Sequence, residues 1–336
     1  MIYIKKFVLF AALAVSVSAF AQTTRITLSV PGPGAASYLP IELIPIIGAD
    51  RAEGAEVQVN FVPGGGVAIS ELQGNNADFA VVGLPAAMSA RLKDPRIVAL
   101  AAVNDLPLYV LLVRAGLRGK VKTIADLKGR TMGVHSNSAT VKTNSHQLLE
   151  LALSKAGVPP TQYRVVAVGQ RWESERAMLA NGDADAVMGD EPHATRMIEK
   201  GIAYSLLHLG DSQQSRQVPG GDFLRGALVG RSDLVYRDPA KADVMVRVLR
   251  RVLLWMASHS PEQIAAKLVF ASEEERAAFT QVMQRYPRQY SKDGKFSSRQ
   301  LKSTETFFRE AQAGNPVAAG FDIESMVLDR WAGRKE

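Results

Sequence analysis

The hydrophobic positions of the chain follow two alternating patterns from residue 25 onward. Short apolar runs typical of strands are followed by longer stretches in which apolar residues recur at helical spacing. This alternation indicates β-α units around a mostly parallel sheet. In the first third of the chain it predicts strands at Ile26–Val30, Val57–Val62, Ala77–Val82, Val98–Val103 and Leu108–Val113, with helices beginning near Tyr38, Val67 and Leu84.

A second set of such units follows the polar, glycine-containing stretch Ala115–Lys122, which we expect to cross between two lobes. The polar loop between the last two predicted strands would be the return crossing. We therefore expect a first lobe of residues 22–114 plus 227–336 and a second lobe of residues 115–226. The predicted strands are Thr131–Val134, Arg164–Val168, Ala184–Met188, Ser205–Leu209 and Ala227–Gly230, and the predicted helices are Thr140–Ala156 and Glu173–Asn181.

The pattern of the last hundred residues predicts mainly helices. Proline in the first turn favours helix starts at Pro239 and Pro261, and Ser272 with Glu275 matches a capping box. The fold expected from the whole pattern is therefore α/β with a helical C-terminal region. The helices predicted there are Pro239–His259, Pro261–Val269, a helix ending at Tyr286, Ser298–Ala313 and Ile323–Trp331.

The first residues have the pattern of an export signal. Lys5 and Lys6 precede the apolar run Phe7–Phe20, and Ala19-Phe20-Ala21 supplies the small residues that a signal peptidase reads. A membrane anchor is the alternative, but the run is shorter than the roughly 20 residues that cross a bilayer. We therefore expect cleavage after Ala21 and a periplasmic mature protein.

Composition narrows the possible chemistry. The 336 residues contain no cysteine, which excludes disulfides, thiol nucleophiles and a lipid-modified cysteine. The formal charge of +7 becomes +5 when Lys5 and Lys6 leave with the signal, because residues 1–21 contain no acid. This excess is spread thinly and no basic motif is interleaved with aromatic residues, so nucleic acid is a poor candidate partner. A mildly basic balance favours an anionic ligand.

Four motifs occur in an order that resembles a known family. They are Val62-Pro63-Gly64-Gly65-Gly66, the run 75–85 (NNADFAVVGLP), the run 125–130 (ADLKGR), and the run 181–186 (NGDADA) followed by Glu191-Pro192. This order resembles the periplasmic solute-binding proteins of ABC importers for nitrate, sulfonates, taurine and thiamine precursors, of the NMT1/THI5-like kind. The resemblance implies a type II periplasmic binding fold, with two lobes of mixed sheets joined by two crossing segments and a ligand held between them.

The predicted ligand site consists of loops at the carboxyl ends of strands, where open α/β sheets bind their ligands. These loops deliver unpaired N–H groups and the positive ends of helix dipoles, which suit an anionic group. The same glycines and serines are also ordinary turn and cap residues, so both interpretations stay open. The ligand-binding candidates are Tyr38, Gly64, Gly65, Gly66, Gly83, Leu84, Pro85, Ser136, Asn137, Ser138 and Thr140.

Two charged residues add to this list. Glu191 matches the position where the family places a residue at the mouth of the second lobe, and Arg171 could clamp an anion or lie on the surface. Trp172 could stack on a ligand or belong to the core. The five histidines lack zinc-type spacing, so we expect no metal, and His193 is the best cleft candidate among them.

The family resemblance implies a substrate-binding component of an ABC importer, with a small organic solute, a permease and an ATPase as partners, no cofactor, and a monomeric state. An enzyme on the same scaffold is one alternative. The related fungal thiamine-precursor synthase uses a cysteine-rich segment that this chain lacks, and no Gly-x-Ser-x-Gly or Walker motif is present. A periplasmic partner of a membrane sensor is the other alternative.

Overall fold

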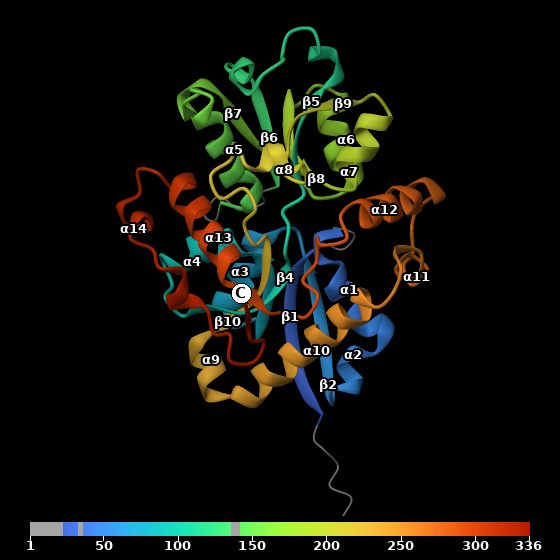
Figure 1. Ribbon diagram of the computed structural model, residues 1–336, viewed down its shortest axis with the longest axis vertical. Helices are drawn as coiled ribbons and strands as arrows, with labels where there is room; N and C mark the ends of the chain where they lie inside the picture. Colours follow the sequence, from blue (N-terminus) through green and yellow to red (C-terminus); the bar gives the residue numbers. More distant parts are fainter. Residues whose placement is uncertain (1–22, 33–35, 136–141) are drawn as a thin grey trace, which may run out of the picture.

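The protein is described by a computed structural model for residues 23–32, 36–135 and 142–336. The predicted signal, Gly34 and the candidates Ser136, Asn137, Ser138 and Thr140 lie outside the described residues. Two lobes, each built on a five-stranded sheet, are drawn one above the other in Figure 1. This confirms the predicted fold class.

The first lobe, drawn below, carries helices on both faces of its sheet. Every residue of β4 is buried, as expected for a strand covered on both sides. Its sheet has the order β2 (Ala55–Val62), β1 (Thr24–Pro31), β3 (Phe79–Gly83), β10 (Gly226–Arg231) and β4 (Ile97–Asn104). Its early helices are η1 (Ala36–Tyr38), α1 (Leu39–Ile47), α2 (Ala49–Ala52), α3 (Gly65–Gln73) and α4 (Leu84–Arg91).

The second lobe repeats this plan. Its sheet has the order β7 (Arg164–Val168), β6 (Thr131–His135), β8 (Ala186–Asp190), β5 (Tyr109–Arg114) and β9 (Ala203–His208). Its helices are α5 (Asn144–Lys155), α6 (Trp172–Ala180), α7 (His193–Glu199) and α8 (Ser212–Ser215), with the short 3-10 turns η2 (Ala115–Leu117), η3 (Ile124–Leu127) and η4 (Pro160–Gln162).

Each sheet contains one strand that runs against its neighbours, β10 in the first and β5 in the second. Each of these strands is the first one that the chain forms after crossing from the other lobe. It therefore starts at the cleft, whereas the neighbouring strands end there. The carboxyl ends of β1, β3 and β4 thus face those of β6, β8 and β9 across the cleft.

The first crossing differs from the sequence expectation. The strand Tyr109–Arg114 pairs with β8 and β9, so the chain crosses at residues 105–108 and not at Ala115–Lys122. The polar stretch instead forms η2 and the turn after it. The apolar run of β5 gave no sign of which sheet it joins, because a buried strand looks the same in either. The predicted return crossing agrees with the topology, since residues 209–225 join β9 to β10.

The C-terminal helices pack on the first lobe, and α12 and α13 also reach the second lobe (Figure 1). The expected helix Ile323–Trp331 is wrong: only η5 forms, and Val327 then makes a bridge to Ala99 of β4. Among the described residues, no helix has the length and apolar character to span a membrane. The elements are α9 (Ser232–Arg237), α10 (Pro239–Ala257), α11 (Pro261–Ala265), α12 (Glu273–Arg285), β11 (Phe296–Ser297), α13 (Ser298–Ala311), α14 (Pro316–Ala319), η5 (Ile323–Met326) and β12 (Arg334–Lys335).

Candidate functional site

The lobes meet through a buried carboxylate that comes from the second lobe. Asp190 is the last residue of β8, and its Oδ2 accepts a hydrogen bond of 3.1 Å from the hydroxyl of Ser37 in η1. The guanidinium of Arg225 pairs with the same oxygen. Arg225 directly precedes β10 and is 4% exposed. A charge-assisted contact of this kind, removed from water, is among the stronger polar interactions in proteins.

Tyrosine rings surround this ion pair. The guanidinium carbon of Arg225 lies 4.7 Å from the ring centroid of Tyr109, and Tyr38 and Tyr290 are also buried. Burial alone would lower the pKa of Arg225, but Tyr109 and Asp190 outweigh it and raise the pKa above its ordinary value. Burial also raises the pKa of Tyr38 and of Tyr290. Arg225 therefore stays positively charged, and the hydroxyl groups of Tyr38 and Tyr290 stay un-ionised.

Asn104, at the end of β4, completes the first-lobe side of the cluster. Its Nδ2 donates a hydrogen bond of 2.9 Å to the backbone oxygen of Ser37. Within the described residues, Asn104 Oδ1 and Arg225 Nε are buried and have no hydrogen-bond partner. Buried polar atoms without partners are uncommon in folded proteins, and they mark places where a ligand or an ordered water completes the bonding.

Asn144 makes a second direct bridge between the lobes. It is the first residue of α5, its Oδ1 accepts from the N–H of Ala86 at 3.1 Å, and its Nδ2 donates to the oxygen of Arg225 at 2.9 Å. Ala86 lies in the first turn of α4, so the second lobe caps a helix of the first. Gly83 permits this approach, because a Cβ there would lie 2.4 Å from Asn144 Oδ1. The structure therefore describes a closed arrangement of the lobes.

A cluster of two histidines and one glutamate lies behind Asp190 in the second lobe. Glu175 of α6 is fully buried and accepts from His135 Nε2 at 2.5 Å and from His193 Nδ1 at 3.2 Å. Burial favours the neutral forms of both histidines, but Glu175 prevails and raises the pKa of each. Burial likewise opposes the charge on Glu175, yet the two histidines lower its pKa. The cluster therefore favours an ionised Glu175 beside protonated histidines.

His135, Glu175 and Asp190 also offer ligand atoms within 4.8 Å of one another, which is compact enough to hold a metal ion. The sequence argument against a metal used spacing along the chain and could not see this grouping. Two contacts favour a hydrogen-bonded cluster over a metal site. Glu175 already accepts from both histidines, and Asp190 already pairs with the cation Arg225.

A cavity of about 280 Å³ opens between the lobes beside these residues. Ala36 and Leu39 line it from the first lobe, and His193 lines it from the second. Ala36 directly precedes Ser37 in sequence, and His193 bonds to Glu175, so the lining of the cavity is linked to the ion pair on one side and to the histidine cluster on the other. Its walls also include the rings of Phe270 and Phe279. This cavity is the candidate solute pocket.

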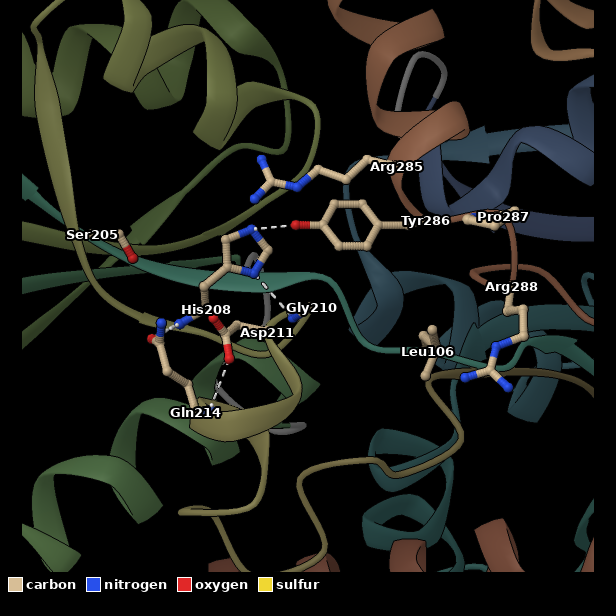
Figure 2. A pocket seen from close by; sticks show the side chains of 10 residues that line it. All are labelled: Leu106, Ser205, His208, Gly210, Asp211, Gln214, Arg285, Tyr286, Pro287 and Arg288. Atoms are coloured by element: carbon tan, nitrogen blue, oxygen red, sulfur yellow. Dashed lines mark hydrogen bonds between the residues drawn. The ribbon is translucent and has the colours of Figure 1, made fainter.

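A second cavity, of about 460 Å³, lies at the crossing segments and is shown in Figure 2. Tyr286 at the end of α12 reaches His208 at the end of β9, with 3.2 Å between the hydroxyl and Nε2. His208 Nδ1 accepts from the N–H of Gly210, so its proton is on Nε2, which donates to Glu191 at 2.9 Å. Arg285 and Arg288 on its rim are exposed. This cavity is better placed to influence opening than to enclose a solute.

The structure places the predicted site residues unequally. Tyr38 lies in the cluster around Asp190 and Arg225. Gly83 directly precedes α4, which begins with Leu84 and Pro85, and Asn144 of the second lobe approaches the chain at Gly83. The glycine turn begins α3: Gly64 is the N-cap, Gly65 and Gly66 are the first helical residues, and all three are buried. A Cβ added to Gly65 would meet no heavy atom of the described chain within 4 Å, so open space lies in front of it.

The polar candidates of the second lobe are less central. Glu191 is 4% exposed, and its carboxylate accepts from the N–H and hydroxyl of Thr195 as well as from His208. Arg171 is the exposed N-cap residue of α6. Trp172 lies under the guanidinium of Arg196 at 3.9 Å and makes an edge contact with His193. Glu191 and Arg171 therefore cap helices here, and Trp172 supports a wall of the cavity.

Sequence reasoning missed most of the residues that join the lobes. Asp190 stood in a recognisable strand-end motif, but its neighbour Glu191 was preferred as the candidate. Ser37 directly precedes the candidate Tyr38 but was not itself singled out. Asn104, Asn144 and Arg225 carry no local signal, because their importance comes from the meeting of distant segments.

The two-lobed architecture with a ligand-sized cavity between the lobes defines the class of type II periplasmic binding folds. A family model of NMT1/THI5-like proteins matches residues 51–264, more than half of the chain, and the protein therefore belongs to the NMT1/THI5-like family. The resemblance drawn from the sequence motifs is thus confirmed. No curated protein matches this chain in sequence.

Solved structures share the fold at low sequence identity. A protein of Bordetella bronchiseptica RB50 is 19% identical with a TM-score of 0.83, covering 93% of this chain and 96% of its own. The alkanesulfonate-binding protein SsuA from Xanthomonas axonopodis pv. citri, bound to MOPS, is 15% identical with a TM-score of 0.70, covering 91% and 98%. The desulfurization enzyme DSZB is 17% identical with a TM-score of 0.58, covering 92% and 97%.

Proposed function

We propose that this protein is the substrate-binding component of an ABC-type importer, which captures a small organic solute by closing its two lobes. Family membership supports a solute-binding role, and the fold is shared with an alkanesulfonate-binding protein. The observation that carries the proposal is the buried contact of Asp190 with Ser37 and Arg225, which joins the lobes beside a cavity of about 280 Å³.

Closure is supported by a set of ion pairs at the edges of the lobes. In each pair the cation comes from the second lobe and the anion from α12 or α13, so the attraction acts only when the lobes are together. The two lysine pairs are exposed, and exposed pairs contribute little individually, so they adjust closure without enforcing it. The pairs are Lys155–Glu310 at 2.7 Å, Lys200–Glu274 at 2.7 Å and Arg196–Glu275 at 3.8 Å.

The test is a thermal-shift screen of small organic solutes, followed by calorimetry and small-angle scattering on each hit. A solute present at 100 times its dissociation constant should stabilise the protein by about 2.7 kcal/mol. The radius of gyration should also fall on saturation, as the lobes close around the solute. Stoichiometric binding with no compaction would contradict the closing mechanism. Chemical turnover of the bound solute would favour an enzyme, as in the desulfurization enzyme that shares this fold.

The export of the protein is part of the same proposal. The segment ending at Ala21 has the pattern of a signal peptide, which would place the mature chain in the periplasm, where we expect a monomer. Mass spectrometry of the mature protein should show a chain that begins at Gln22. Permease and ATPase genes beside its own would support import, whereas a neighbouring sensor kinase gene would support the sensing alternative.

A further inference from the structure

We propose that Asp190 is a built-in counter-ion of the solute site, and that the solute therefore presents hydrogen-bond donors, an amine or amide group on a partly apolar body, in place of an anionic group. This inference rests on the proposed function and names the class of solute for the same site. The mildly basic sequence favoured an anion. The structure shows that Arg225, the buried cation where the lobes meet, already has the carboxylate of Asp190 beside it.

The geometry of Asp190 is that of a bound anion. Its Oδ2 accepts from the hydroxyl of Ser37 at 3.1 Å and from the guanidinium of Arg225. Both donors belong to the first lobe, and Asp190 comes from the second. A carboxylate or sulfonate of a solute that bound at Arg225 would compete for these same donors, because Arg225 is buried where the lobes meet. Such a solute would have to displace Asp190 and leave it buried and unpaired, which is strongly unfavourable.

The remaining groups around the site are mainly acceptors. Ser37 and Arg225 both use Oδ2 of Asp190, so its other oxygen lies outside this pairing. Asn104 Oδ1 is buried without a partner among the described residues. These oxygens suit N–H or O–H groups on a solute. Arg225 Nε is the one first-lobe donor in this cluster that is likewise without a described partner.

The lining of the cavity points the same way. Its charged lining residues are Glu42, Glu275 and Lys267, and Glu275 also lies 3.8 Å from Arg196. The rest is largely apolar, with the rings of Phe270 and Phe279 among its side chains. A solute with a partly apolar body would match these rings.

The test compares four probes that share a six-carbon chain: hexylamine, hexanamide, hexanoate and hexane-1-sulfonate. We expect the wild-type protein to bind the better of the two donor probes at least tenfold more tightly than either anion. Asp190→Asn keeps an acceptor oxygen but removes the negative charge that neutralises Arg225, so the anions should gain at least tenfold and the amine should lose affinity. Asp183→Asn removes an exposed charge from the same lobe and is the matched control.

If Asp190→Asn does not fold, Asp190→Ser removes the same negative charge with a smaller side chain. Wild-type protein that prefers an anion, together with no gain of anion affinity in the variant, would overturn the inference. Failure of all four probes with both proteins would also overturn it, because Arg225, no longer neutralised, should accept an anion. The proposed function would in that case still be judged separately, by the broader solute screen and the scattering measurement.

Discussion

Replacing Glu175 with glutamine tests whether the buried histidine cluster stabilises the second lobe. Glu175 is fully buried and accepts from His135 at 2.5 Å and from His193 at 3.2 Å. The glutamine side chain would have nearly the same shape, but it would lack the charge and place an amide N–H₂ against one of the rings. The substitution thus changes electrostatics and hydrogen bonding with little change in packing volume.

The expected loss of stability follows from the two bonds. A hydrogen bond to a charged group contributes about 1.5–3 kcal/mol. The glutamine of Glu175→Gln keeps one acceptor, so about one of the two bonds is lost. The histidines also lose the charge that favours their protonation, and breaking a buried pair by removing one partner costs about 3–5 kcal/mol. We therefore expect the free energy of unfolding to fall by about 3 kcal/mol near pH 6.

The dependence of this stability on pH tests the histidine cluster more specifically than the loss of stability at one pH. The pKa values of His135 and His193 are raised above the ordinary 6.5, so their stabilising effect is complete below about pH 6.5 and is lost as pH rises through the raised values. The pKa of Glu175 is lowered from 4.5, so its contribution is complete above about pH 4.5 and is lost on acidification. Asp190 also raises the pKa of both histidines, whereas Arg225 acts against His135 and Arg196 against His193.

Urea unfolding at pH 6 and pH 9 measures both effects. The wild-type protein should lose stability over this interval, and Glu175→Gln should lose less, so the two curves converge at high pH. Glu173→Gln, at an exposed position of the same helix, is the control and should follow the wild type. Parallel curves separated by a constant amount would refute the reasoning, because the histidines would then not be coupled to Glu175.

Three further expectations concern closure. Gly83→Ala would place a Cβ 2.4 Å from Asn144 Oδ1, so it should weaken solute binding at least tenfold by calorimetry with intact lobes, whereas Gly119→Ala, at an exposed position with room for its Cβ, should bind normally. Tyr286→Phe removes the hydroxyl that meets His208 and should destabilise the closed form by about 1 kcal/mol, seen as faster hydrogen exchange at the crossing segments. Raising the salt concentration should weaken solute binding only slightly, because the ion pairs that α12 and α13 form with the second lobe are largely exposed.

The fold was predictable from the sequence because each strand carries its own signal. An alternation of apolar runs and helical spacing fixed all ten strands of the two sheets, with ends shifted by a few residues at most. The assignment of β5 to a lobe was not predictable, because strand pairing is decided by partners elsewhere in the chain. The expected final helix failed for a related reason: Val327 bonds as a strand to Ala99 of β4, and this contact overrides local preference.

The candidate site was predictable only where a backbone feature carries it. Gly83 and the start of α4 were found because a glycine before a helix at a strand end is visible in the sequence. Arg225 was not found, because it lies at the end of a polar crossing and resembles any surface arginine until the fold buries it. Residues of this kind are identified by the contacts that they make across the cleft in the folded structure.

The two bridges between the lobes have one feature in common that bears on how the protein selects its solute. In each bridge a side chain of the second lobe fills a position of the first lobe that is suited to an anion. Asn144 accepts from the first turn of α4, and Asp190 accepts from Ser37 and Arg225. Helix starts and buried arginines attract anions in most proteins. In this protein, closure of the lobes gives the start of α4 and Arg225 hydrogen-bond partners from the second lobe. An anionic solute at either place would compete with these side chains. A solute with hydrogen-bond donors would instead bond to acceptor oxygens that have no partner within the described part of the closed form, such as Asn104 Oδ1.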